Sequence, residues 1–309
     1  MTTALITHER CALHRPPPRH PESPARLETV LEAFSSEEFK DLSRIEAVPA
    51  STDQLALVHP VSHIEAVEKA VPDNGYAFVD EDTVMSSGSF DAALLSAGAA
   101  TQAVDMVIDR QVKNAFCATR PPGHHAEPER AMGFCFFSNA AISARHAQSA
   151  HGLGRIAVVD FDVHHGNGTE AAFAPYDSLL YASSHQHPLY PGTGMESTTG
   201  VANNIVNAPL PPHADGKAFR AAYEQRVLPA LEAFAPEFLI ISAGFDGHRR
   251  DPLAQMDLED EDYRWVTQEL CEIAARCCGG RVVSLLEGGY DLDALASASR
   301  AHVRALMAA

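Results

Sequence analysis

Four side chains able to bind a metal or carry protons follow a single apolar run. In residues 156–168, IAVVDFDVHHGNG, these are Asp160, Asp162, His164 and His165. Burying such groups is costly unless each is paired. Asp162 and His164 are two residues apart on an expected extended segment, so we predict that they share one face. They form half of a divalent metal site, or part of a hydrogen-bonded cluster that caps a sheet.

Asp246 could supply a third ligand, because it follows another apolar run, FLIISAG. Three protein ligands with one open position are typical of catalytic zinc, although an oxygen-rich set also accepts iron or cobalt. Asp160 is expected on the same face as Asp162, and two carboxylates repel each other unless cations share them. A monovalent cation held by oxygens would relieve that repulsion, and Asp160 could also orient the ring of His124.

Groups suited to proton transfer lie in two further loops. His124 and His125 end the segment RPPGHH, and histidine can act as base or acid near neutral pH. Adjacent histidines are also common on protein surfaces, so that alternative stays open. Tyr290 follows Gly288 and Gly289, where its phenol could donate a hydrogen bond to a developing oxyanion or simply pack in the core.

Aromatic residues in two loops suggest a binding slot. Phe134 follows Gly133 in MGFCFF, and Tyr190 lies in LYPGTG. Two rings of this kind could enclose an alkyl chain, and ordinary core packing is the competing interpretation.

The ends of buried strands would position these groups. Seven short runs, several of them apolar on both faces, predict a mostly parallel sheet covered by helices on both faces. They span residues 3–7, 114–119, 155–161, 178–183, 203–210, 238–244 and 281–289. Helical patterns alternate with them at residues 23–34, 89–110, 138–152, 215–234, 260–277 and 291–307. The alternation predicts a single α/β domain over residues 1–309, with its site beyond the carboxyl ends of the strands.

Composition narrows the partners and the compartment. The formal net charge of -18 disfavours binding to nucleic acid and would attract cationic substrates. Six cysteines without a Cys-x-x-Cys pair indicate reduced thiols rather than disulfides or a thiolate zinc site. There is no basic leader and no apolar stretch of bilayer length, so we expect a cytoplasmic protein that does not contact a membrane. The sequence leaves homo-oligomerisation open.

These segments together resemble the histone deacetylase family, which has the arginase–deacetylase fold. The matching segments are HPESPARL, RPPGHHAEPERAMGFCFFSNAA, VVDFDVHHGNGTEAAF, YPGTG, ISAGFDGHRRDPL and LEGGYDL. They occur in the family's order across nearly the whole chain, and RPPGHH and HHGNG are most similar to the class II branch and its bacterial homologues. The resemblance implies hydrolysis of an N-acyl amide to a free amine and a carboxylate.

The resemblance also implies residue roles. One zinc ion would be bound by Asp162, His164 and Asp246. His125 would shuttle protons, and its neighbour His124 would be supported by Asp160. Asn167 stands behind His125, where some family members have an aspartate. Tyr290 would polarise the scissile carbonyl; some relatives carry histidine there and are poor deacetylases.

Potassium is the second implied cofactor, with one or two structural ions. By the same resemblance, the first ion would be held by Asp160, Asp162, His164, Ser183 and Ser184. A second cation site is expected near Phe173, Tyr176, Leu179 and Asn204.

The implied substrate is an acylated lysine peptide. Phe134 and Tyr190 would flank its methylene chain, with the Gly133 carbonyl alongside. Polyamine-selective relatives have a glutamate where this chain has Leu253, which favours acyl-lysine. Acetylpolyamines or other small acylated amines are the alternative substrates.

The residues argue against two rival functions. A binuclear manganese ureohydrolase of the same fold needs a carboxylate two residues after His164, where this chain has Gly166. A catalytically silent module that binds acyl groups would not need the full set of metal ligands, tandem histidines and Tyr290.

Overall fold

One parallel sheet organises the protein, which a computed structural model describes over residues 1–309. Its eight strands run in the order β2-β1-β5-β10-β9-β6-β7-β8, and every neighbouring pair is parallel. The strands are β1 Thr3–Thr7, β2 Ser43–Glu46, β5 Asn114–Cys117, β6 Ile156–Asp160, β7 Leu179–Gln186, β8 Ile205–Leu210, β9 Phe238–Ala243 and β10 Val282–Leu286. A separate short hairpin pairs β3 Ala77–Phe78 with β4 Val84–Met85.

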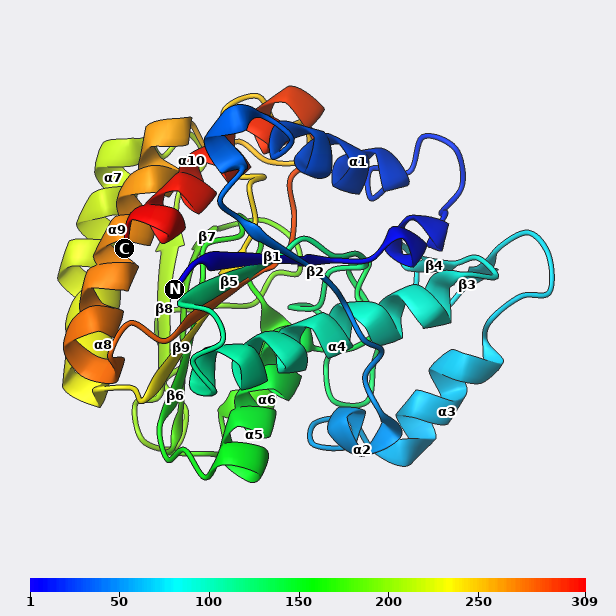
Figure 1. Ribbon diagram of the computed structural model, residues 1–309, viewed down its shortest axis with the longest axis horizontal. Coiled ribbons are helices and arrows are strands. Elements are labelled where there is room, and N and C mark those ends of the chain that lie inside the picture. The colour runs from blue at the N-terminus through cyan, green and yellow to red at the C-terminus, as the bar shows by residue number, and fades with distance from the viewer.

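Helices cover both faces of this sheet (Figure 1). The α-helices are α1 Pro24–Ala33, α2 Thr52–Leu55, α3 Val61–Lys69, α4 Ser89–Ile108, α5 Asn139–His151, α6 Asn167–Phe173, α7 Gly216–Ala222, α8 Leu228–Phe234, α9 Asp260–Cys278 and α10 Leu292–Ala308. Helices α1, α9 and α10 pack together on one face, while α4, α5 and α6 lie on the other. The predicted α/β class with a parallel sheet between helix layers is confirmed.

The central strands are buried on both faces, as their uninterrupted apolar sequences predict. Every residue of β5, β6, β9 and β10 is buried. Their apolar residues belong to a continuous core of 67 buried apolar residues that extends through both helix layers. A rigid core of this kind keeps the loops at the strand ends in a defined arrangement.

Two expectations about elements need correction. The expected single helix at 215–234 contains a π-helical turn, Tyr223–Val227, immediately before α8. Pro229 lies just beyond this turn and has no backbone N–H to continue a regular ladder. The edge strand β2 was not predicted, because its sequence SRIE alternates half-buried and exposed residues and carries two charges.

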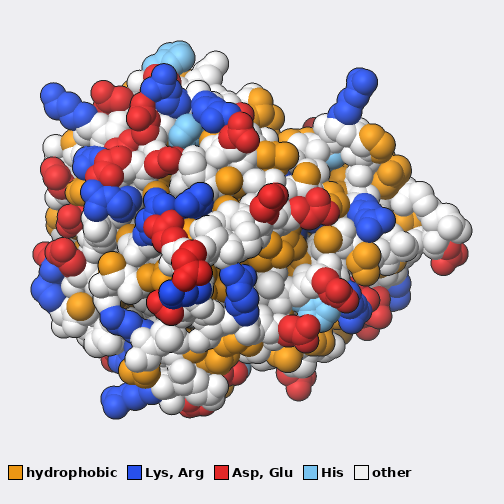
Figure 2. Space-filling view, turned by 45° about the horizontal axis from the view of Figure 1, so that its top comes forward, with side chains coloured by type: hydrophobic (Ala, Val, Ile, Leu, Met, Phe, Trp, Pro, Cys, Tyr) orange, Lys and Arg blue, Asp and Glu red, His pale blue; other side chains and the backbone are white.

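The surface carries both signs of charge. Figure 2 shows acidic and basic side chains interspersed on one face of the molecule rather than separated by sign. None of the helices combines the length and apolar character that a bilayer-spanning segment requires.

Candidate active site

Three metal-ligating side chains converge at the carboxyl end of the sheet. Asp162 and His164 follow β6, and Asp246 follows β9, which pairs with β6. Their ligand atoms all lie within 4.8 Å of one another, and we call this set the inner cluster. His164 Nδ1 is 3.1 Å from Asp162 Oδ1 and 3.0 Å from Asp246 Oδ2. The convergence makes a shared ion geometrically feasible.

The inner cluster lies in a cradle made by glycine. A Cβ atom at Gly288 would be 2.1 Å from Asp246 Oδ2 and 2.6 Å from Asp162 Oδ2, so no larger residue fits without moving the carboxylates. The Gly288 N–H donates to Asp162 Oδ2 over 2.7 Å, and the Val163 N–H donates to Asp246 Oδ1 over 2.9 Å. Backbone donors thus orient both carboxylates toward His164.

The charge balance of the inner cluster also fits a cation. Burial and the charge of Asp162 raise the pKa of Asp246 to about 7. Burial alone would lower the pKa of His164, but its hydrogen bonds to the two carboxylates raise it to about 10. In the absence of a metal, the protonated His164 imidazole therefore balances the charge of the two buried carboxylates. A divalent ion would neutralise the carboxylates instead and leave the imidazole neutral.

The route by which Asp162 and His164 meet differs from the prediction. Strand β6 ends at Asp160, so the two ligands do not share the face of an extended strand. They lie in a turn in which the His164 N–H donates to Asp162 Oδ1 over 2.9 Å. Aspartate favours such local bonds to its own backbone, which explains why the chain leaves the strand here.

The tandem histidines have different supports. His124 Nδ1 is 3.0 Å from Asp160 Oδ2, and His125 Nδ1 is 2.9 Å from Asn167 Oδ1. Both rings are buried, with centroids 4.0 Å apart. Burial would lower the pKa of His124, but Asp162 and Asp160 raise it well above its usual range. Burial and the charge of His124 lower the pKa of His125 well below its usual range, so the pair combines one cationic and one neutral imidazole.

Tyr290 reaches the same pocket from the loop after β10. A pocket of about 250 Å³ is lined by Asp82, His125, Gly133, Phe134, His164, Leu189, Tyr190, Leu253 and Tyr290. Burial raises the pKa of Tyr290 well above 10, which keeps its phenol protonated as a hydrogen-bond donor. Gly133 and Phe134 both adopt positive φ values, of 56° and 69°, at a tight turn in the pocket wall. All four predicted substrate-contacting residues therefore line one pocket with three of the predicted catalytic and metal-binding residues.

His165 does not join the inner cluster, although it follows His164 directly. Its Nδ1 is 2.8 Å from Thr193 Oγ1, and its Nε2 is 2.9 Å from Glu170 Oε2. Of the two adjacent histidines in residues 156–168, His164 therefore belongs to the inner cluster, while His165 contacts a neighbouring loop.

At each of the two predicted cation sites, some of the residues named for it are neighbours in the structure. Asp160 is paired in register with Ser183 on β7, and its Oδ2 accepts a hydrogen bond from the Tyr181 hydroxyl over 3.0 Å. At the second predicted position, Asn204 Nδ2 lies 2.9–3.0 Å from three backbone carbonyls. Those carbonyls belong to Phe173, Tyr176 and Leu179.

Two supporting residues were not assigned a role from the sequence. Glu287 Oε2 accepts the Gly123 N–H over 2.7 Å and the His124 N–H over 3.2 Å, so it holds the loop of the tandem histidines. Arg26 is buried, donates to the Gly289 carbonyl over 2.6 Å, and lies 4.9 Å from the centre of the Tyr290 ring. For Glu287, a carboxylate directly after the apolar run of β10 was the available indication, whereas Arg26 lies in a helix with other polar residues and gave none.

Comparison with known proteins agrees with this geometry. The family model for the histone deacetylase domain matches residues 20–306. The chain belongs to the histone deacetylase family. It is 39% identical to histone deacetylase 10, chloroplastic, of Oryza sativa subsp. japonica over 93% of this chain and 70% of that protein. It is 40% identical to a histone deacetylase-like amidohydrolase of Pseudomonas aeruginosa over 88% of this chain and 72% of the relative.

A solved structure extends the similarity to the whole fold. The crystal structure of the HDA15 HD domain superimposes with a TM-score of 0.94 at 36% identity, covering 100% of this chain and 89% of that one. The predicted fold is confirmed. As a member of the family, the chain is a hydrolase of linear amide bonds with an Asp/His set suited to a metal.

Proposed function

We propose that the chain is a zinc-dependent deacylase that hydrolyses N-acetyl-lysine-type amides to a free amine and a carboxylate. The observation that carries this proposal is the convergence of Asp162, His164 and Asp246 beside a pocket that His125 and Tyr290 also line. A silent acyl-binding module would have no need for this combination. The residues fit the zinc ion typical of the family, because they offer three ligands in one buried place.

Each side chain has a role that follows from its environment. When bound, zinc would polarise the scissile carbonyl and acidify water. His125, neutral and held through Nδ1 by Asn167, takes a proton at Nε2 from the attacking water and later returns it to the departing amine. Tyr290 donates its phenolic hydrogen to the carbonyl oxygen as negative charge develops there. His124, kept cationic by Asp160, contributes positive charge beside the reacting groups.

The pocket wall supports a long aliphatic chain. Phe134 and Tyr190 line it with apolar rings, and the Gly133 carbonyl can accept a hydrogen bond from the substrate. Leu253 stands at the mouth, where it is 36% exposed and offers no charge to a second amine. These features favour an acyl-lysine peptide as substrate, with acetylpolyamines or other small acylated amines as the alternative.

One or two potassium ions complete the proposal. Asp160, Asp162, His164, Ser183 and Ser184 would hold the first beside the inner cluster. The second is supported by the three carbonyls that converge on Asn204, because an amide nitrogen has only two hydrogens to offer them. We also propose that residues 1–309 act as one catalytic domain in the cytoplasm.

The test uses the purified chain with zinc removed and restored. Acetate release should vanish with the metal and return with one equivalent of zinc. An acetyl-lysine peptide should then be cleaved with a higher kcat/KM than N-acetylputrescine or acetylspermidine. Faster cleavage of the acetylated amines would select the alternative substrate class, and no amide hydrolysis with bound zinc would refute the deacylase.

A further inference from the structure

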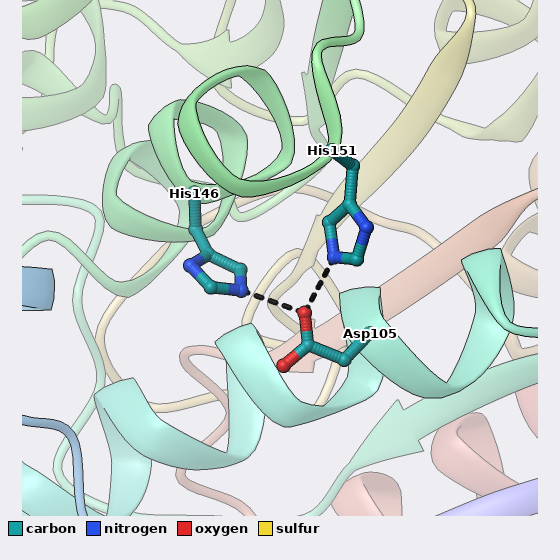
Figure 3. Close-up of side chains that lie close together, drawn as sticks. All are labelled: Asp105, His146 and His151. Carbon is teal, nitrogen blue, oxygen red and sulfur yellow. Dashed lines mark hydrogen bonds and ion pairs between the residues drawn. The ribbon is translucent and has the colours of Figure 1, made fainter.

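A second group of metal-ligating side chains lies far from the pocket. Asp105 of α4 and the α5 residues His146 and His151 place their ligand atoms within 4.8 Å of one another, and we call them the outer cluster. Figure 3 shows both imidazoles pointing from α5 toward the carboxylate on the adjacent helix. His146 Nε2 is 2.7 Å and His151 Nε2 is 2.6 Å from the same atom, Asp105 Oδ1.

The outer cluster is separate from the proposed catalytic machinery. Helix α5 begins at Asn139, whose Nδ2 contacts the Pro121 carbonyl near the tandem histidines. It ends at His151, shortly before β6 begins at Ile156. Since Asp162 follows the other end of β6, the outer cluster lies at the amino end of the sheet and the inner cluster at its carboxyl end.

The donors of the outer cluster suit a borderline divalent metal. Two imidazoles and one carboxylate form a ligand set that zinc accepts, with ligand distances of about 2.0–2.2 Å. Neither histidine uses Nδ1 for a hydrogen bond within the protein, so each can keep its proton on Nδ1 and present Nε2 to a metal. Arg145, the nearest basic neighbour in sequence, lies over the Tyr176 ring at 4.6 Å and pairs with Gln148.

The exposure of the outer cluster gives an ion both access and an open position. The side chains of His146 and His151 are 11% and 19% exposed, while that of Asp105 is 42% exposed. A metal could thus enter from solvent and keep water as its fourth ligand. Asp105 Oδ1 faces Nε2 of both imidazoles, so the carboxylate already points to the position that an ion would share.

We propose that Asp105, His146 and His151 form a second zinc-binding site, which links α4 to α5 at the end of the sheet opposite the pocket loops. The alternative is a purely hydrogen-bonded tie in which both imidazoles donate to Asp105 Oδ1. The two differ in a measurable way, because only the metal site changes the zinc content of the protein.

The experiment counts zinc in the full chain after removal of metal, saturation with zinc and gel filtration. The wild-type protein should retain two equivalents, and His151→Gln or His146→Gln should retain one with unchanged acetate release. Asp246→Ala should also retain one equivalent, without activity. His213→Gln is the matched control, because His213 lies 3.5 Å from Asp257 without a second histidine, and it should retain both ions.

Cobalt provides a second measurement that does not depend on activity. In the Asp246→Ala background, one equivalent of cobalt should give visible absorption typical of imidazole and carboxylate ligands, and adding His151→Gln should abolish it. The proposal is overturned if wild type retains one zinc that Asp246→Ala removes, or if both histidine variants retain two. It is equally overturned if the cobalt spectrum survives His151→Gln.

Discussion

The inner and outer clusters use the same two kinds of ligand in opposite proportions. The inner cluster has two wholly buried carboxylates and one imidazole, whereas the outer has one carboxylate, 42% exposed, and two imidazoles. Without a metal, Oδ1 of the outer carboxylate is bonded to two imidazoles. The inner carboxylates share His164 as their common partner, and their hydrogen bonds raise its pKa to about 10.

This difference shows what burial adds to a ligand set. Like charges repel strongly when they are desolvated. A cation that neutralises both inner carboxylates therefore stabilises the inner cluster by a large free energy. Solvent already screens the charge of the outer carboxylate, so the binding of an ion there releases less free energy. We therefore expect the inner cluster to bind zinc more tightly and to control activity, and the outer cluster to bind it more weakly.

The largest effect is expected from Asp246→Ala. Removal of one of three ligands leaves two in the inner cluster, which should weaken zinc binding there by at least about 10²-fold, more than the loss of a supporting residue costs. Acetate release should fall below detection. Zinc analysis and acetate assays on the same sample check this, and full zinc occupancy of the inner cluster would overturn the ligand assignment.

Tyr290→Phe should separate catalysis from metal binding at the inner cluster. The phenol does not belong to the ligand set, so zinc content should stay at the wild-type value. Loss of one donor to the developing oxyanion should lower kcat by about 10²–10³-fold. Steady-state kinetics with an acetyl-lysine peptide measure this effect, and a kcat within about threefold of wild type would contradict the role.

Gly288→Ala tests whether the cradle keeps the inner carboxylates in place. The added methyl group would overlap both Asp246 and Asp162, so zinc affinity should fall by about 10–100-fold, as when ligand orientation is lost. Gly154→Ala is the matched control, because a Cβ there meets nothing closer than 3.5 Å. Competition with a zinc-binding dye measures both, and equal affinities would show that the cradle can relax.

The inner cluster was largely predictable from the sequence, because its ligands follow short, predominantly apolar runs. Strands β6 and β9 could be located by composition alone, and parallel strands bring their carboxyl ends to one edge. The turn between Asp162 and His164 was missed, since a period of two does not show where a strand ends. The role of Glu287 could not be predicted, because its partners in the loop of the tandem histidines are more than 160 residues away in sequence.

The outer cluster could not be predicted in the same way. Its residues lie inside two correctly predicted helices, but nothing in a helical pattern states how two helices are rotated about their axes. His146 is buried where α5 packs on α4 and His151 ends α5, a relation that only tertiary packing reveals. Short elements such as α2, α6 and β2 were missed for a related reason: they are held by neighbours rather than by their own periodicity.

Graded chelation should separate the two clusters without any mutation. If burial makes the inner cluster the tighter one, a weak chelator should first remove one zinc equivalent with no loss of acetate release. A stronger chelator should then remove the second equivalent together with activity. Parallel zinc analysis and kinetics give the order, and loss of activity with the first equivalent would reverse the ranking of the two clusters.

The smallest effect is expected for Asp105→Asn in metal-free protein. The carboxylate is more than a third exposed, so its hydrogen bonds to His146 and His151 should stabilise the fold by about 1 kcal/mol or less at pH 7. The folded-state pKa of Asp105 is lowered, so this contribution is complete above the unfolded pKa of about 3.9. It is lost only as the pH falls through the lower folded-state value. Urea unfolding measures the free energy of unfolding of wild type and variant at pH 7 and at pH 5. The titration of Asp105 should therefore contribute no change to the difference between the two proteins over this pH range. A loss above about 2 kcal/mol would mean that the outer cluster is a structural tie even without metal.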